Sequence, residues 1–344
     1  MKDMDLDSVL VLDELNQRYL SGFAYSDGYL LITLDRAYLV TDFRYYEMAQ
    51  KKAYEDFEIV MPDSLSSFLT ERVAEHGCCR MGFEGGSVSY ATYRRYSDLL
   101  PSVELVNIDT MIEDIRTIKT DEELSLIAKA QSITDLAFSH LLSVIKPDMT
   151  EIDVAVELEY AMRKNGADGF AFETIAVSGD ASALPHGKPR AEKLHRGFLT
   201  MDFGARYDGY CSDMTRTVVI GKADEDMKKL YNTVLKAQNE SLAFLREGVD
   251  LGEADKVARD IIDAEYKGCF GHSLGHSVGL YIHEAPGLSR RYFGRRARVG
   301  EIFTVEPGIY VYGKYGCRIE DMVAIEEDGI HNFTISDKNL IEIY

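Results

Sequence analysis

Apolar and polar positions in the first third of the chain alternate between short runs and helical spacing. Two short apolar runs, 29–33 and 37–41, are separated by Asp35-Arg36, which is typical of a β-hairpin. The same patterns recur farther along and predict a strand over 81–84 and helices over 43–53, 64–76 and 90–99. Short strands that alternate with helices predict an α/β layer domain over residues 1–117.

The pattern changes near residue 118, where longer amphipathic helices begin. Thr120 precedes three acidic residues, which marks a helix start, and apolar spacing continues to about Val144. Thr150 caps a second helix that ends at Asn165-Gly166. A strand pair follows between residues 197 and 220. We therefore expect a second domain over residues 118–344.

The order helix, helix, strand pair then recurs within this second domain. Helices are predicted over about 224–246 and 252–266, and a strand pair over 302–325. The segment Pro147–Asp153 has a faint echo in Val249–Asp255. We interpret this order as an internal duplication, which predicts a pseudo-two-fold α+β domain with two antiparallel hairpins flanked by helices.

Charge and composition narrow the possible partners. The chain has 344 residues, with 58 acidic and 38 basic side chains and a formal net charge of −20. Such a surface repels phosphate backbones and anionic lipids, so we expect neither nucleic acid nor membrane as a partner. The acidic start MKDMDLDSVL does not resemble a signal peptide, and five scattered cysteines fit a reducing compartment. These features predict a cytoplasmic protein.

The first predicted hairpin of the second domain carries two aspartates. Asp208-Gly209 is a turn signal, and a turn centred near residues 207–208 places Asp202 opposite Asp213. Directly opposed residues share one face of a sheet, so their carboxylates repel each other unless cations lie between them.

The second hairpin repeats this arrangement, because Glu306 and Glu320 lie symmetrically about Gly313. Four carboxylates from two hairpins suit two divalent cations about 3.5–4 Å apart. An imidazole ligand is available in the glycine-rich segment 271–284, and His186 is a further candidate in a loop. Oxygen ligands with one imidazole suit manganese, iron, cobalt or zinc. Each feature alone is commonplace, and their joint occurrence predicts a two-metal site.

These segments resemble the pita-bread metallopeptidases, and in particular their Xaa-Pro branch, which comprises prolidase (Xaa-Pro dipeptidase) and aminopeptidase P. The resemblance rests on MDFGARYDGYCSDMTRT, HSLGHSVGLYIHE, TVEPGIY and RIED, which stand at the spacing of that family. Three further segments resemble the N-terminal creatinase-like domain and its linker, namely RYLSGF, LVTDFRYYEMA and IRTIKTDEEL. The implied fold is a pita-bread catalytic domain that follows an α/β creatinase-like domain.

The resemblance implies a role for each candidate residue. Asp202 would bind one metal ion, and Asp213 and Glu320 would bridge both ions. His276 and Glu306 would complete the shell of the second ion, and Glu306 would also carry a proton towards the leaving nitrogen. The residues expected to donate hydrogen bonds to the substrate are His186, His272 and His283.

Arginines cluster between residues 290 and 298 in this otherwise acidic chain. They could form a solvated loop, or Arg290 or Arg291 could bind a substrate carboxylate through a bidentate contact. A dipeptidase must recognise the free C-terminus two residues from the cut, whereas an aminopeptidase need not. Arg318 could assist in that recognition or could orient Glu320.

We therefore predict a hydrolase that uses two metal ions to release the residue before proline from a small peptide. Manganese is the expected metal, with cobalt, zinc or iron as alternatives. The compact length favours a dipeptidase, and an aminopeptidase P that acts on longer peptides is the alternative. A non-catalytic binding protein of the same fold is a third hypothesis, which the retention of all five ligands opposes. The resemblance also implies a homodimer.

Overall fold

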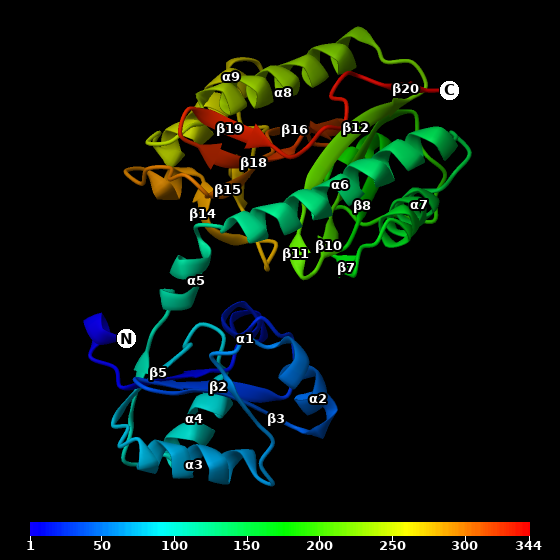
Figure 1. Cartoon of the computed structure of the whole chain (residues 1–344). Coiled ribbons are helices and arrows are strands. Elements are labelled where there is room, and N and C mark those ends of the chain that lie inside the picture. Colours follow the sequence, from blue (N-terminus) through cyan, green and yellow to red (C-terminus); the bar gives the residue numbers. More distant parts are fainter. The chain divides into compact units, whose positions relative to one another are not determined.

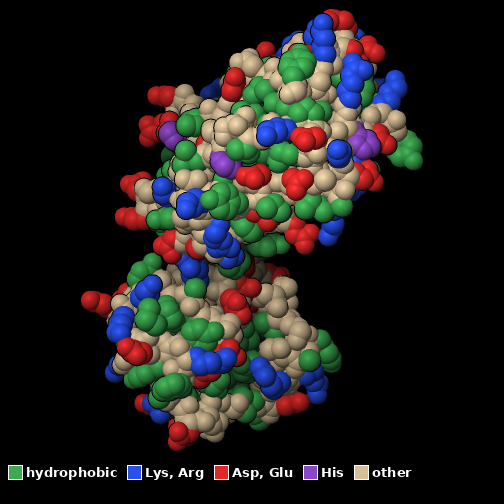
Figure 2. Space-filling view, turned by 90° about the vertical axis from the view of Figure 1, so that its right-hand side faces the viewer, with side chains coloured by type: hydrophobic (Ala, Val, Ile, Leu, Met, Phe, Trp, Pro, Cys, Tyr) green, Lys and Arg blue, Asp and Glu red, His purple; other side chains and the backbone are tan.

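The computed structural model describes all residues from 1 to 344, which form two compact units. The units comprise residues 1–116 and 117–344, and each is described by itself (Figure 1). None of the helices combines the length and the apolar character that a membrane span requires. On the face shown in Figure 2, acidic and basic side chains are interspersed over both units.

Residues 1–116 form a mixed sheet with helices between its strands. In chain order the elements are η1 (Lys2–Met4), β1 (Ser8–Val11), α1 (Glu14–Ser21), β2 (Gly28–Thr33), β3 (Ala37–Thr41), α2 (Phe43–Lys52), β4 (Glu58–Val60), α3 (Leu65–Glu75), β5 (Arg80–Phe83), α4 (Tyr90–Leu99), β6 (Glu104–Asn107) and α5 (Met111–Arg116). The strand order is β4-β3-β2-β1-β5-β6. The three central strands pair antiparallel, and β4, β5 and β6 join in parallel.

Strand β1 shows why both faces of this sheet are covered. Val9 and Val11 belong to one apolar cluster, which includes Ala49 of α2, and Leu10 belongs to another, which includes Leu69 of α3. Successive side chains of a strand point to opposite faces, so a continuous apolar run requires cover on both sides. In Figure 1, α1 and α2 lie on one side of the sheet, and α3 and α4 lie on the other.

The predicted hairpin, helices and strand of this unit are present, and no bound differs by more than one residue. The apolar pattern did not reveal β1, α1, β4, β6 and α5. Helix α1 lacks an apolar stripe because the residues that it buries, Asn16, Gln17 and Ser21, are polar. Hydrophobic periodicity cannot reveal a helix whose buried face is held by hydrogen bonds.

Residues 117–344 contain the predicted repeat of helix, helix and hairpin. In chain order the elements are α6 (Asp121–Val144), α7 (Glu151–Lys164), β7 (Gly169–Phe170), β8 (Ile175–Ser178), η2 (Gly179–Ala183), β9 (Gly197–Phe203), β10 (Ala205–Tyr207), β11 (Tyr210–Cys211), β12 (Met214–Ile220), α8 (Glu225–Phe244), α9 (Leu251–Tyr266), β13 (Gly275–Ser277), β14 (Glu284–Leu288), η3 (Arg290–Tyr292), β15 (Ile302–Val305), β16 (Gly308–Val311), β17 (Tyr315–Arg318), β18 (Asp321–Glu326), β19 (Gly329–Asn332) and β20 (Glu342–Ile343). The first repeat pairs α6 and α7 with β9 and β12, and the second pairs α8 and α9 with β15 and β18.

Local capping fixes the starts of the first two helices of this unit. The hydroxyl of Thr120 accepts from the backbone N–H of Glu123, whose side chain accepts from the N–H of Thr120. Thr150 and Asp153 form the same capping box at the start of α7. Both helices thus begin where the sequence predicted, because two otherwise unpaired backbone donors are satisfied at each start.

The first hairpin turns one residue later than predicted. Its turn residues are Asp208 and Gly209, both with positive φ, which is typical of a two-residue type I′ turn. Asp202 therefore pairs with Thr215. The expectation that Asp202 lies directly opposite Asp213 was wrong. Asp213 stands two positions before Thr215, so it points to the same face of the hairpin and lies diagonally from Asp202.

The second hairpin has the predicted register. The pairs β15–β18 and β16–β17 lie on either side of the two glutamates and share a single register. This register places Glu306 opposite Glu320, symmetrically about Gly313.

Two apolar clusters hold these hairpins against their helices. One packs α6 and α7 against β8, β9 and β12. The other packs α8 and α9 against β15 and β18, and in Figure 1 these two helices lie together along one side of the second hairpin. Because the helices cover one side of each hairpin, polar residues at the ends of the strands are free to face a common cavity.

Candidate active site

All five residues of the predicted metal site line one cavity of about 970 Å³. Asp202 lies in β9, and Asp213 immediately precedes β12. His276 lies in β13, Glu306 follows β15, and Glu320 precedes β18. Strand ends of both repeats therefore bring together four carboxylates and one imidazole that are far apart in the sequence.

The donor atoms of this cluster lie close to one another. Nε2 of His276 is 3.5 Å from Oδ2 of Asp213 and 3.5 Å from Oε1 of Glu306. One donor atom from each of Asp213, His276 and Glu320 lies within 4.8 Å of the others. The first oxygen, Oδ1, of Asp202 and of Asp213 is buried without a hydrogen-bond donor. Buried acceptors of this kind require a partner, and a divalent cation would provide one.

The charges of the cluster also favour cations. Burial, followed by the charge of Glu320, raises the pKa of Asp213 well above its usual value. Burial, followed by the charge of Glu306, raises the pKa of Glu320, and burial raises the pKa of Glu306 to about 8. These carboxylates resist ionising together unless positive charge is placed among them. The donor set therefore fits divalent metal ions.

His276 is held in the form that binds metals. Burial, followed by the neighbouring His283, lowers the pKa of His276 to about 4. Nδ1 of His276 lies 3.1 Å from the carbonyl oxygen of Ser277, which can only accept, so the ring proton resides on Nδ1. The lone pair of Nε2 is consequently directed at the carboxylates, as in metal-binding histidines whose other nitrogen is fixed by a hydrogen bond.

Arg318 is buried and is already bound to the cluster. Its Nη2 donates to Oδ2 of Asp202 at 2.7 Å, and its Nη1 donates to the hydroxyl of Tyr310 at 2.7 Å. Its Nε donates to Oγ1 of Thr215, which in turn donates to Glu320. Arg318 therefore orients Asp202 directly and reaches Glu320 only through Thr215. Its guanidinium has no free fork for a substrate carboxylate, contrary to one of the expectations above.

His272 is also engaged within the cavity wall. Its Nδ1 lies 2.9 Å from the carbonyl oxygen of Ser273, and its Nε2 lies 3.0 Å from the hydroxyl of Tyr310. Burial lowers the pKa of His272 to about 4, so the ring is neutral and Tyr310 donates to Nε2. Both ring nitrogens are occupied, so this geometry does not provide the free donor that was expected of His272.

His186 and His283 lie in the same cavity, where substrate contacts were expected. The ring of His283 packs edge-on against that of His276, with 4.4 Å between the ring centroids. Burial lowers the pKa of His283, so this ring favours its neutral form. His186 is exposed on the loop after η2. The cavity thus presents two histidines beside the carboxylate cluster.

Comparison with known families agrees with this geometry. Residues 125–327 match metallopeptidase family M24, and residues 1–118 match the creatinase/prolidase N-terminal domain. The chain belongs to metallopeptidase family M24. Its fold is an N-terminal creatinase-like domain followed by the catalytic domain of this family.

Relatives of this M24 peptidase span its whole length. A solved structure of an Xaa-Pro dipeptidase from Bacillus anthracis has a TM-score of 0.96 and 40% identity, and covers 99% of this chain and 96% of its own. An X-Pro aminopeptidase from Thermotoga maritima has a TM-score of 0.93 and 35% identity, with 98% of both chains covered. An Xaa-Pro dipeptidase of Pyrococcus furiosus is 36% identical over 99% of this chain and 97% of the relative.

Two arginines that the sequence suggested as substrate anchors lie outside the cavity of this M24 peptidase. Arg290 and Arg291 belong to the short helix η3 and are not among the residues that line the cavity. Arg290 lies 3.9 Å from the buried carboxylate of Asp255. The only lysine or arginine side chains that line the cavity are Lys188 and Arg318, and Arg318 is already bound to Asp202, Thr215 and Tyr310.

Other residues of this M24 site were not identified from the sequence. Thr215 and Tyr310 connect the cluster to Arg318 and His272, as described above. The cavity also has an apolar wall, whose members include Ile152, Val156, Phe170 and Phe172. Ile152 and Val156 lie one turn apart on α7 and are 42% and 54% exposed. Apolar residues outside the buried stripe of an amphipathic helix were the signal that could have revealed this wall.

Proposed function

We propose that this chain is a two-metal peptidase that cleaves the bond between an N-terminal residue and proline. The observation that carries the proposal is the meeting of four carboxylates and one neutral imidazole in one cavity, in a chain of family M24. Related chains named Xaa-Pro dipeptidase and X-Pro aminopeptidase support the choice of substrate.

We assign the metal ligands as Asp202, Asp213, His276, Glu306 and Glu320, with Asp213 and Glu320 shared by both ions. When bound, the ions would supply Lewis-acid polarisation of the scissile carbonyl and activation of a water molecule.

The remaining steps belong to side chains of the cavity. Glu306, 3.5 Å from His276, is the group that we assign to proton transfer towards the leaving nitrogen. His186 and His283 would donate hydrogen bonds to the substrate, and His272 would hold the wall through Tyr310. The apolar wall would accept the proline ring or the side chain before it.

The length of the substrate is the finer question. We favour the dipeptidase, in which Lys188 is the available cation for the free carboxylate of a dipeptide. One observation favours the alternative, aminopeptidase P: Lys188 is 82% exposed and already lies 3.0 Å from Glu173. Because an exposed ion pair is weak, Lys188 can exchange Glu173 for the carboxylate of a dipeptide at little cost in free energy. We therefore still favour the dipeptidase.

The test compares Ala-Pro, Ala-Pro-Ala and Ala-Ala with protein stripped of metal and then given manganese or cobalt. Metal-dependent cleavage of Ala-Pro alone supports the dipeptidase, and cleavage mainly of the tripeptide supports aminopeptidase P. In a dipeptidase, Lys188→Met should raise KM for Ala-Pro, whereas Lys193→Met in the same loop should not. Absence of cleavage of any of the three peptides with metal bound would refute the proposed substrate.

Further features of the proposal rest on sequence and on family likeness. We propose manganese as the native metal, a cytoplasmic location and a homodimer. The five cysteines are free of disulfides, in agreement with a reducing compartment. We place the division between the creatinase-like and catalytic domains at residues 117 and 118.

A further inference from the structure

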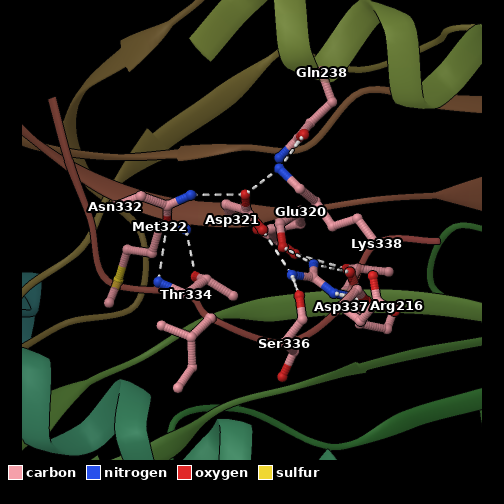
Figure 3. A network of polar contacts seen from close by, with 12 residues as sticks. Arg216, Gln238, Glu320, Asp321, Met322, Asn332, Thr334, Ser336, Asp337 and Lys338 are labelled. Atoms are coloured by element: carbon pink, nitrogen blue, oxygen red, sulfur yellow. Dashed lines mark hydrogen bonds and ion pairs between the residues drawn. The ribbon is translucent and has the colours of Figure 1, made fainter. Parts of the chain in front are cut away.

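A buried polar network lies directly behind Glu320 and contributes no side chain to the cavity (Figure 3). Its centre is the ion pair between Arg216 of β12 and Asp321 of β18, with 2.8 Å between Nη2 and Oδ1. Both side chains are at most 1% exposed. Burial of two charges costs free energy, so a buried ion pair adds little net stability. Stability alone therefore does not account for the pair of Arg216 and Asp321.

Every N–H of the Arg216 guanidinium has an acceptor. The five acceptors are the carbonyl oxygens of Thr215, Glu320, Ser336 and Asp337 and the carboxylate of Asp321. A guanidinium has five donors in a fixed plane, and here all five are used. The arrangement therefore fixes the positions of three backbone segments, at residues 215–216, 320–321 and 336–337, relative to one another.

The segment that supplies two of these carbonyls is itself anchored from both repeats. Asp135 of α6 accepts from the backbone N–H of Ser336 at 2.8 Å. Lys338 donates to Gln238 of α8 at 2.9 Å and to Oδ2 of Asp321 at 2.7 Å. Because one helix of each repeat holds residues 335–338, Arg216 is fixed against a rigid frame.

The carbonyl groups of Thr215 and Glu320 connect Arg216 to the carboxylate cluster. The backbone N–H of Glu320 donates to the carbonyl oxygen of Thr215 at 3.1 Å, which joins the two hairpins where their carboxylates meet. Nη1 of Arg216 donates to both of these carbonyl oxygens. Asp213 stands two residues before Thr215, so this junction fixes the distance between Asp213 and Glu320.

We propose that Arg216 and Asp321 are positioning residues that set the separation of Asp213 and Glu320, and through it the affinity of the site for divalent cations. The inference rests on the ligand roles of these two carboxylates proposed above. It adds that the junction between the repeats is shaped by a side chain that never contacts the metal ions or the substrate.

The test is a direct measurement of manganese binding by titration calorimetry on metal-stripped protein. Arg216→Lys keeps the charge, but its ammonium offers three donors from one point and cannot satisfy the five acceptors that the planar guanidinium holds apart. We expect manganese to bind roughly 10–100-fold more weakly, the usual cost of losing a partner that orients a ligand. The visible absorption spectrum of the cobalt-loaded variant should shift as well, since it reports the geometry of the ligands.

Arg190→Lys is the matched control. Arg190 also pairs with a fully buried carboxylate, that of Glu151, at 2.7 Å, and neither residue lines the cavity. This control should lower the melting temperature and leave the affinity for manganese unchanged. A general loss of stability would affect both variants alike, so the difference between them isolates the positioning role.

The outcomes separate the inference from the proposed function. If the wild-type chain binds no manganese, the metal proposal fails; if it binds and folded Arg216→Lys binds equally well, only the inference fails. If Arg216→Lys does not fold, Lys338→Met provides the test. The Lys338 side chain is 23% exposed, so its replacement disturbs the core less, and the substitution removes one donor from Asp321. Weaker manganese binding by Lys338→Met would support the inference, and unchanged binding would overturn it.

Discussion

The two hairpins that supply the carboxylates balance their charges differently. Asp202 of the first hairpin is bound by the buried guanidinium of Arg318. Glu306 of the second hairpin has no lysine or arginine within ion-pair distance and faces the neutral ring of His276. A fixed positive charge weakens the attraction of a nearby cation, and an uncompensated carboxylate strengthens it. Repetition of one arrangement of elements has thus produced two unequal halves of a metal site.

The largest expected effect is a loss of activity on removal of Asp213 or Glu320, and it should be equally large for both hairpins. Asp213 and Glu320 come from different hairpins but occupy the centre of the cluster. Asp213→Ala and Glu320→Ala should each lower kcat/KM for a proline peptide by about 10³-fold or more, roughly 4 kcal/mol of transition-state stabilisation. Peptide hydrolysis at saturating manganese measures this loss, and circular dichroism checks the fold. Retained activity in Asp213→Ala at full metal load would refute the ligand assignment.

Metal removal should destabilise the fold, because the carboxylate of Glu306 then has no positive charge beside it. A cation at about 100 times its dissociation constant stabilises the fold by about 2.7 kcal/mol. The folded-state pKa of Glu306 is raised to about 8 by burial, and those of Asp213 and Glu320 are raised too. In the metal-free protein these acids favour folding when protonated. The contribution of Glu306 is complete below about pH 4 and is lost as the pH rises through about 8, and those of Asp213 and Glu320 change in the same direction.

Manganese should therefore raise the melting temperature more at pH 8 than at pH 6. Differential scanning fluorimetry with chelator or manganese at both pH values measures the two increments. The physical reason is that ionised carboxylates are ligands with metal present and repel one another without it. Equal increments at the two pH values would show that the cluster does not bind the cation.

The unequal halves themselves are tested by removing one outer ligand from each. Glu306→Gln should weaken the tighter of the two manganese sites, and Asp202→Asn should weaken the other, which Arg318 already opposes. We expect Glu306→Gln to weaken manganese binding at the tighter site at least about tenfold more than Asp202→Asn does, a difference of roughly 1.4 kcal/mol. Calorimetric titration resolves the two sites, and the reverse order would overturn the comparison drawn above.

The contrast also shows what the sequence could predict. Asp202, Asp213, Glu306 and Glu320 could be selected because each pair brackets a turn, and turns and periodicity are local properties. The register of the first hairpin was misjudged by one residue because the type I′ turn uses Asp208-Gly209 itself.

The engagement of Arg318 and His272 could not be predicted from local patterns. Arg318 meets Asp202 across 116 positions of the chain, and His272 meets Tyr310 across 38. The contact of Arg318 with Asp202 follows from how the two repeats pack, and that of His272 with Tyr310 follows from how distant segments of the second repeat pack. The position of Arg290 outside the cavity depends on the path of a loop, which no local signal specifies.

The smallest effect should arise at the tip of the second hairpin, where it resembles the first. Gly313 has a φ of 70°, close to the 73° of Gly209, and a Cβ at Gly313 would meet no atom within 4 Å. Gly313→Ala should therefore cost about 1 kcal/mol of stability from backbone conformation alone, because L residues disfavour positive φ. Urea denaturation measures this loss.

Manganese affinity should not change in Gly313→Ala, because the tip lies seven residues along the chain from both Glu306 and Glu320. Gly204→Ala provides the contrasting control, since a Cβ there would lie 1.9 Å from the carbonyl oxygen of Ser212, next to Asp213. That substitution should disturb both stability and metal binding. A change in metal affinity in Gly313→Ala would mean that the turn, and not the junction between the hairpins, sets the geometry of the second pair of carboxylates.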